Sequence, residues 1–148
     1  MNNMESVRVK KIRQNACLPV YGSAEAAGAD LHACLTQDVI IKPGETVFIP
    51  TGLSMEIPKG CAGLIYARSG LASKRGLAPA NKVGVIDSDY RGEFIVALHN
   101  HGQEDQTVSH GERVAQLLIT PVFTPAYIEV SALDETKRAA GGFGSTGK

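Results

Sequence analysis

The sequence has no tryptophan and only eight aromatic residues, four tyrosines and four phenylalanines, among its 148 residues. It also has no excess charge, because 15 lysines and arginines balance 15 aspartates and glutamates. Zero net charge removes bulk electrostatic attraction to nucleic acid or to an anionic membrane, although it leaves room for local basic pockets. No apolar run approaches the roughly 18–20 residues of a membrane-spanning helix. We therefore expect no direct nucleic-acid partner and no membrane partner.

Cysteine is scarce as well. Cys17, Cys34 and Cys61 are odd in number and widely spaced, without a C-x-x-C pair. This pattern argues against a disulfide framework and predicts buried reduced thiols, as in an intracellular protein. The first residues, MNNMESVRVKKIR, lack the apolar segment of a signal peptide. We expect a soluble, intracellular chain.

The rest of the composition is that of an ordinary globular domain, with 43% hydrophobic and 20% charged residues. A single domain of this length buries roughly 68–70% of its unfolded surface. Alternation at Val7/Val9 and at Ile128/Val130 is typical of half-buried strands. Short apolar runs, each closed by turn residues, lie at 39–41, 47–49, 64–66, 94–96 and 117–119. Together these patterns predict an all-β sandwich, jelly roll or barrel.

Helical signals are few. The best candidate runs from Ser69 to about Arg75, with Ser69 as the N-cap and Gly76 as the stop. The Ser69 hydroxyl and the amides after it would then form an anion site. The last eight residues, GGFGSTGK, contain four glycines and predict a mobile arm.

Several short patterns match known ligand-binding motifs but lack a feature that the motif requires. The arm matches two glycine-rich phosphate-binding patterns, but both require a helix directly afterwards, which the sequence does not supply. Residues 87–92 begin like a calcium loop, yet Arg91 occupies a ligand position and Leu98 replaces the closing glutamate. His99 and His101 would share one strand face, but two histidines without further ligands are weak evidence for a metal site.

Five clusters of polar residues and glycine lie at the ends of the expected strands. Each alone has an ordinary explanation, such as a turn at residues 28–30 or a hairpin end at Asp87. Their order and spacing are more specific. They read AGADLHA at 27–33, ARSGLA at 67–72, GVIDSDYRGE at 84–93, GERVAQ at 111–116 and GGFGSTG at 141–147. In this order they closely resemble the five motifs of the trimeric dUTP pyrophosphatase (dUTPase) family.

The resemblance implies a single dUTPase domain over residues 1–148, folded as a distorted jelly-roll β-barrel with one short helix. It implies a homotrimer with active sites between subunits, and a flexible arm at 139–148 that closes over an active site. The implied reaction is hydrolysis of dUTP to dUMP and pyrophosphate, by Mg²⁺-assisted attack of water on the α-phosphorus. This reaction would keep uracil out of DNA and supply dUMP for dTMP synthesis, in the cytoplasm or in a eukaryotic nucleus.

The resemblance also assigns the reacting groups. Asp87 would be the catalytic carboxylate that orients and deprotonates water. Asp30 would hold Mg²⁺ through water, because this cation keeps several waters and binds substrate phosphates. Ser69 would lie near the leaving-group bridge oxygen. The implied phosphate contacts come from Arg68, Ser69, Gly70 and Gln116.

Recognition of the nucleoside would come from the hairpin between Asn81 and Ile95. The resemblance implies that Asn81 and the main chain near Val85, Ile86 and Ile95 bind uracil and leave no room for a 5-methyl group. Tyr90 would pack against deoxyribose and exclude a 2′-hydroxyl group.

The arm would complete the site. Phe143 is expected to stack on uracil and Arg138 to pair with the γ-phosphate, while Gly144, Ser145 and Thr146 wrap the phosphates. Two other functions remain open from the sequence. One is a dCTP deaminase-like or bifunctional enzyme on the same fold, and the other is a non-catalytic nucleotide-binding module.

Overall fold

Antiparallel strands make up almost all of the regular structure. A computed structural model describes residues 6–145 and Gly147. The strands are β1 (Arg8–Lys11), β2 (Val20–Tyr21), β3 (Ala29–His32), β4 (Val39–Ile41), β5 (Thr46–Pro50), β6 (Leu53–Glu56), β7 (Cys61–Tyr66), β8 (Leu77–Pro79), β9 (Gly84–Ile86), β10 (Ile95–Asn100), β11 (Gln106–Val108) and β12 (Arg113–Pro121); the helix α1 spans Ser69–Arg75. The predicted all-β class with one short helix is confirmed. Within the described residues, no helix is long and apolar enough to cross a membrane.

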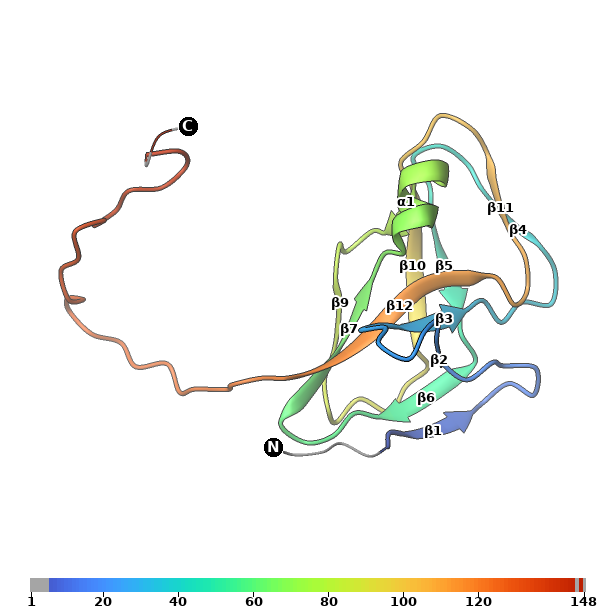
Figure 1. Cartoon of the computed structure of the whole chain (residues 1–148), viewed down its shortest axis with the longest axis horizontal. Coiled ribbons are helices and arrows are strands. Elements are labelled where there is room, and N and C mark those ends of the chain that lie inside the picture. Colours follow the sequence, from blue (N-terminus) through green and yellow to red (C-terminus); the bar gives the residue numbers. More distant parts are fainter. Residues whose placement is uncertain (1–5, 146, 148) are drawn as a thin grey trace.

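The strands form a distorted jelly roll (Figure 1). Its largest sheet has the order β2-β3-β12-β7-β9, so that β12 lies in the middle and β9 at an edge. A second sheet has the order β5-β10-β8, and the pairs β1-β6 and β11-β4 close the remaining sides. Each of these pairings is antiparallel.

The core follows the two-residue alternation of the strands. In β10, Val96, Leu98 and Asn100 are buried, whereas Ile95 faces outward. In β12 the register shifts between Arg113 and Ala115, which leaves one extra residue on this strand. A bulge of this kind lets Val114 and Ala115 both be buried although they are neighbours in the sequence.

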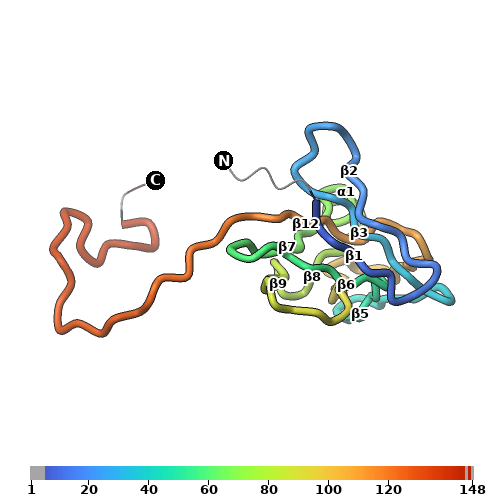
Figure 2. Tube along the Cα trace, turned by 90° about the horizontal axis from the view of Figure 1, so that it is seen from below, coloured from blue at the N-terminus to red at the C-terminus, as the bar shows by residue number. Residues whose placement is uncertain are grey.

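Four of the five apolar runs of the sequence lie entirely in strands, and in the fifth Phe94 directly precedes β10. Val9, which alternates with charged neighbours, lies half-buried in β1. The strand expected at Ile128–Val130 is wrong, because the described residues 122–130 form no strand and Ile128 is 81% exposed. Figures 1 and 2 show the reason: the chain leaves the body after β12, so this segment has no strand to pair with.

The helix has the predicted limits but not the predicted N-cap. Arg68 is the N-cap, with extended backbone, and Ser69 is the first helical residue. The hydrogen bonds begin one residue early, because the Ala72 N–H donates to the Arg68 carbonyl at 3.0 Å. No side chain caps the start. Gly76 ends the helix with φ +65°, as expected of a glycine stop.

The cysteines are free thiols, as predicted, but the prediction that they are buried holds only for Cys34. Cys34 is buried and its Sγ donates to Asn15 Oδ1 at 3.2 Å, whereas Cys17 and Cys61 are only partly buried. Burial raises the pKa of the Cys34 thiol, which keeps it protonated.

We predict that Asn100→Leu lowers the free energy of unfolding by about 3 kcal/mol or more, because buried groups lose their partners. The Asn100 amide donates to the carbonyls of Ile41 and Glu104 at 2.9 and 2.8 Å, and its Oδ1 accepts from the Gly102 N–H at 2.9 Å. Urea unfolding at fixed protein concentration measures the effect. The exposed Gln103→Leu is the matched control, and equal losses in the two variants would contradict the prediction.

Candidate functional site

A cavity of about 180 Å³ opens beside the hairpin after β9. Three exposed apolar side chains, those of Val85, Tyr90 and Ile95, contribute to its wall. The remaining lining residues are Ile86, Asp87 and Glu93. A carboxylate at the rim of a small apolar cavity suits a planar, uncharged ring bound next to a reacting water.

The hairpin turn fixes the positions of Asp87 and Tyr90. Asp87 follows β9 directly, and its carbonyl accepts the Tyr90 N–H at 3.2 Å. The Tyr90 hydroxyl donates to the Glu93 carbonyl at 3.0 Å, which folds the ring over the turn. A Cβ on Gly92 would overlap this ring, so glycine is required at position 92. Because β9 is an edge strand, main-chain polar groups on its outer side stay available to a ligand.

A second cavity, of about 240 Å³, lies where β3, β12 and the start of α1 meet. Asp30 accepts from Arg68 Nε at 2.8 Å and from Arg113 Nη1 at 3.4 Å. Two guanidinium groups against one carboxylate give this cavity a net positive charge. The first amides of α1 at Ser69 and Gly70 also line it and have no helical acceptor. The arrangement suits a polyanion such as a phosphate chain.

Gln116 is held in this second cavity from two sides. Its Nε2 donates to the Ala67 carbonyl at 2.8 Å. Its Oε1 lies so close to Gly28 that a Cβ there would come within 2.6 Å of it. The absence of a side chain at Gly28 therefore leaves the space that the Gln116 amide occupies beside Asp30.

The two cavities are well separated within one chain. Asp30 is in register with Gln116 and Gln116 with Tyr66, whereas Ile86 is in register with Gly63, three residues away from Tyr66 along β7. Three strand spacings and three residues of rise place Asp30 and Ile86 about 17 Å apart. Asp87, next to Ile86, is therefore too distant to act at the cavity of its own Arg68 and Ser69.

The remaining expected site residues lie elsewhere. Asn81 is exposed in the turn between β8 and β9 and does not line either cavity. Arg138, Phe143, Gly144 and Ser145 lie on the arm, which extends away from the body (Figure 1). In the arm Arg138 Nε donates to the Gly141 carbonyl at 2.8 Å, and Phe143 is fully exposed. Thr146 lies outside the described residues.

Comparisons with known proteins identify the family of this chain. The family model described as dUTPase matches residues 14–147. This chain belongs to the dUTPase family. A deoxyuridine 5'-triphosphate nucleotidohydrolase of Desulfitobacterium hafniense is 52% identical, over 97% of this chain and 99% of the relative.

Two solved structures of phage enzymes are also similar. A variant dUTPase of Staphylococcus bacteriophage 80alpha, solved with dUpNHpp, has a TM-score of 0.89 and 27% identity, over 97% of this chain and 99% of that chain. A variant dUTPase of phage phi11 of S. aureus, described with a structural Mg(II) ion, has a TM-score of 0.78 and 25% identity, over 86% of this chain and 97% of that chain. The family resemblance of the sequence is therefore confirmed.

Two charged residues of the cavities, Arg113 and Glu93, went unassigned in the sequence. Arg113 stands in the motif GERVAQ, but simple alternation would place it on the opposite face from Gln116, and only the bulge between Arg113 and Ala115 brings it to the cavity of Asp30. Glu93 ends the motif GVIDSDYRGE, but nothing local indicates its partner, because Arg13 lies 80 positions earlier.

The described residues offer no ready-made metal cage. Among residues 6–145 and Gly147, no three histidine, cysteine, aspartate or glutamate side chains lie together as ligands. The rings of His99 and His101 do approach, with centroids 4.4 Å apart, but His99 Nδ1 contacts Thr46 Oγ1 at 2.8 Å. A cation at the second cavity would therefore depend on Asp30 and on ligands that arrive with the substrate.

His32 yields a pH prediction for the positive cavity. Burial lowers the pKa of His32, and the cations of Arg113 and Arg68 lower it further against the opposing effect of Asp30. Its Nδ1 is buried and has no hydrogen-bond partner among the described residues. An unfolded histidine takes up its proton near pH 6.5, so the free energy of unfolding falls as the pH drops through this value.

We expect His32→Gln to reduce this loss of stability on acidification. Urea unfolding at about pH 7.5 and about pH 5.5 measures it in both proteins. The pKa of His101 is also lowered by burial, but His101 is present in both proteins. The difference in pH dependence between the two proteins therefore reports the contribution of His32 alone. Identical pH dependence in both would contradict the prediction.

Proposed function

We propose that this chain hydrolyses dUTP to dUMP and pyrophosphate, with Mg²⁺ as cofactor. The observation that carries the proposal is the carboxylate of Asp87 at the rim of a small apolar cavity. Relatives that share about half of its residues are named for this activity. In a cell the reaction would keep uracil out of DNA and supply dUMP for dTMP synthesis, and we infer a cytoplasmic location.

Uracil is proposed to enter the cavity of about 180 Å³ beside β9, which we call the base cavity after the nucleotide base. The free edge of this strand supports main-chain hydrogen bonds from Val85 and Ile86 to the base. Apolar contact with Val85 and Ile95 supports a flat ring and disfavours charged groups. Asn81 would assist through its side chain from the adjacent turn.

The sugar is proposed to meet Tyr90. Its hydroxyl already donates to the Glu93 carbonyl, so the ring presents a face rather than a hydrogen bond to the ligand. A face of this kind accepts the bare C2′ of deoxyribose and would clash with a 2′-hydroxyl group. Because UTP carries this 2′-hydroxyl group, the Tyr90 ring would exclude it.

The phosphates are proposed to bind in the positive cavity. Arg68 uses Nε for Asp30, which leaves its two terminal nitrogens for phosphate oxygens. Ser69 and Gly70 would add the free amides of the first helical turn, with Ser69 near the leaving-group bridge oxygen. Gln116 would contact the chain from β12.

The residues at this cavity fit a hydrated Mg²⁺ rather than a metal caged by protein. Asp30 is the one carboxylate in the lining, and each of its oxygens can still accept a hydrogen bond from a metal-bound water. When bound, Mg²⁺ neutralises phosphate charge and makes the α-phosphorus easier to attack. Asp87 would orient the attacking water and accept its proton.

A homotrimer with active sites between subunits follows as part of the proposal. The carboxylate of Asp87 must act within about one water molecule of the phosphorus that Ser69 helps to hold. Because Asp30 of the positive cavity lies about 17 Å from Ile86, the neighbour of Asp87, in one chain, the two halves of a site must come from different copies. The extended arm would bring Phe143, Arg138, Gly144 and Ser145 to the uracil and phosphates of such a site.

A substrate panel tests the activity. We predict release of pyrophosphate from dUTP with Mg²⁺, and much slower release from UTP, dTTP and dCTP. Ammonia release from dCTP would instead indicate a deaminase, and binding without turnover would indicate a nucleotide-binding module. Asp87→Asn should lower kcat for dUTP by about 100-fold or more, because the general base is lost, while nucleotide binding is retained.

Asp89→Asn is the control for this substitution. It removes an equal charge two residues away, from a side chain outside the base cavity, and should leave turnover near the wild-type rate. Turnover of Asp87→Asn at the wild-type rate would remove Asp87 from the role of base.

Shared sites also predict complementation between inactive variants. Arg68→Ala and Asp87→Asn should each be inactive, yet co-refolding equal amounts should restore about a quarter of the wild-type activity. A site works only if the subunit that supplies Arg68 is the Asp87→Asn variant and the subunit that supplies Asp87 is the Arg68→Ala variant. Each condition is met by half of the subunits, so about a quarter of the sites are intact. Mixing without subunit exchange is the control, and an inactive co-refolded mixture would contradict sites built from two copies.

A further inference from the structure

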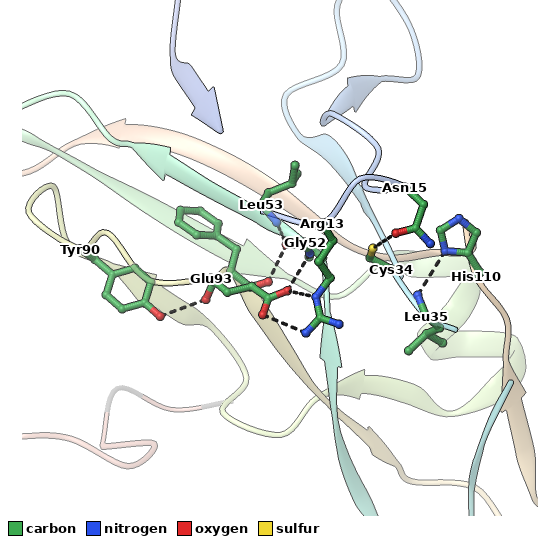
Figure 3. A network of polar contacts seen from close by, with 11 residues as sticks. Arg13, Asn15, Cys34, Leu35, Gly52, Leu53, Tyr90, Glu93 and His110 are labelled. Atoms are coloured by element: carbon green, nitrogen blue, oxygen red, sulfur yellow. Dashed lines mark hydrogen bonds and ion pairs between the residues drawn. The ribbon is translucent and has the colours of Figure 1, made fainter. Parts of the chain in front are cut away.

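Next to the base cavity, Arg13, Gly52 and Glu93 form a closed set of polar contacts (Figure 3). Arg13 Nε and Nη2 donate to the two carboxylate oxygens of Glu93 at 2.9 and 3.3 Å. The Gly52 N–H donates to the same Oε1 at 2.9 Å, and the Gly52 carbonyl accepts the Arg13 N–H at 3.4 Å. Three segments far apart in the sequence are thereby tied at one point.

The Gly52 position leaves no room for a side chain. The backbone of Gly52 has φ +69°, and an added Cβ would come within 2.8 Å of the Ala16 Cβ. Glu93 has a side chain that is only 16% exposed, so its charge is largely desolvated and depends on the Arg13 guanidinium. A two-point Arg–carboxylate contact in such a setting also fixes orientation.

The same residue, Glu93, holds Tyr90. Its side chain is fixed by Arg13 and Gly52, while its main-chain carbonyl accepts the Tyr90 hydroxyl at 3.0 Å, as Figure 3 shows. The Tyr90 ring also packs on the buried Phe94, with centroids 6.2 Å apart. Phe94 in turn is bound to Leu53, whose carbonyl accepts the Phe94 N–H at 2.8 Å.

We propose that Arg13 and Glu93 are positioning residues that hold the Tyr90 ring in place and thereby set the discrimination between deoxyribose and ribose nucleotides. The inference rests on the proposed function. A steric barrier excludes a ligand only if the barrier does not yield. A ring released from the Glu93 carbonyl could turn aside for a 2′-hydroxyl group, whereas a deoxyribose would bind to either arrangement.

The test compares kcat/KM for dUTP and for UTP in each variant. We expect Glu93→Ala to lower the dUTP-to-UTP ratio about tenfold or more, mainly through faster UTP turnover. Arg13→Ala should act in the same direction, and Glu93→Gln should act less because it keeps an acceptor for Gly52. Tyr90→Phe, which removes only the hydroxyl that Glu93 binds, should lower the ratio to a similar extent.

Arg13 and Glu93 should behave as one unit. The double variant Arg13→Ala/Glu93→Ala should then have a ratio close to that of Glu93→Ala alone. The matched control is Glu56→Gln, which removes one carboxylate charge from the exposed ion pair with Arg8 and should leave the ratio unchanged. A loss of stability alone lowers the apparent kcat/KM for dUTP and for UTP by the same factor. The dUTP-to-UTP ratio therefore responds to the position of the Tyr90 ring and not to the amount of folded protein.

The possible results separate the inference from the function on which it rests. A wild-type protein that fails to hydrolyse dUTP overturns the proposed function. A wild-type protein that prefers dUTP to UTP, together with an unchanged ratio in Glu93→Ala, overturns the positioning role alone. If Glu93→Ala does not fold, Arg13→Ala and Glu93→Gln provide the test. An unchanged dUTP-to-UTP ratio in both variants then overturns the positioning role.

Discussion

The pairing of β12 with two neighbours at once is the constraint on which both cavities depend. Gln116 is opposite Asp30 of β3 on one side and Tyr66 of β7 on the other. This register aligns an acid, an amide and the chain segment that leads into α1. Because side chains alternate between faces, a shift of one residue would turn Asp30 and Gln116 away from each other. Strand pairing therefore brings Asp30 and Gln116 together in the positive cavity, and the loop before β3 completes its wall.

Charge in this protein is arranged locally. The chain is neutral as a whole, yet its positive cavity joins Arg68 and Arg113 against a single carboxylate. The base cavity, by contrast, is largely apolar around Asp87. A nucleotide triphosphate has the same division, with an uncharged base at one end and a polyanion at the other. Net charge thus says little about the class of ligand.

Local patterns predicted the local structure well. The run Val39–Ile41 became a strand because the fold supplies a partner for it, Gln106–Val108, although that partner is distant in the sequence. Gly76 ended the helix in the αL conformation that glycine adopts without strain. The alternation at Ile128 and Val130 failed because a strand also needs a free edge to join. Arg68 rather than Ser69 is the N-cap, because the first helical hydrogen bond ends on the Arg68 carbonyl.

The site was harder to predict than the fold. Its motifs named the residues that gather in the two cavities, but the distance between Asp30 and Asp87 depends on registers across four strands. No spacing in the sequence contains that information. The Arg13–Glu93 contact is similar, because it joins residues 80 positions apart without any motif at Arg13.

The segment between β12 and the arm, which contains Phe123 and Tyr127, affects how the protein exists in solution. Phe123 and Tyr127 are each 97% exposed, so this segment presents to water the side chains that folding normally removes from it. In the proposed trimer a second copy would cover them, and stability would then follow mass action. Dilution would weaken fold and chemistry together, and a lone subunit would be a target for proteases and for aggregation. The amount of protein would thus help decide how much assembled enzyme is present.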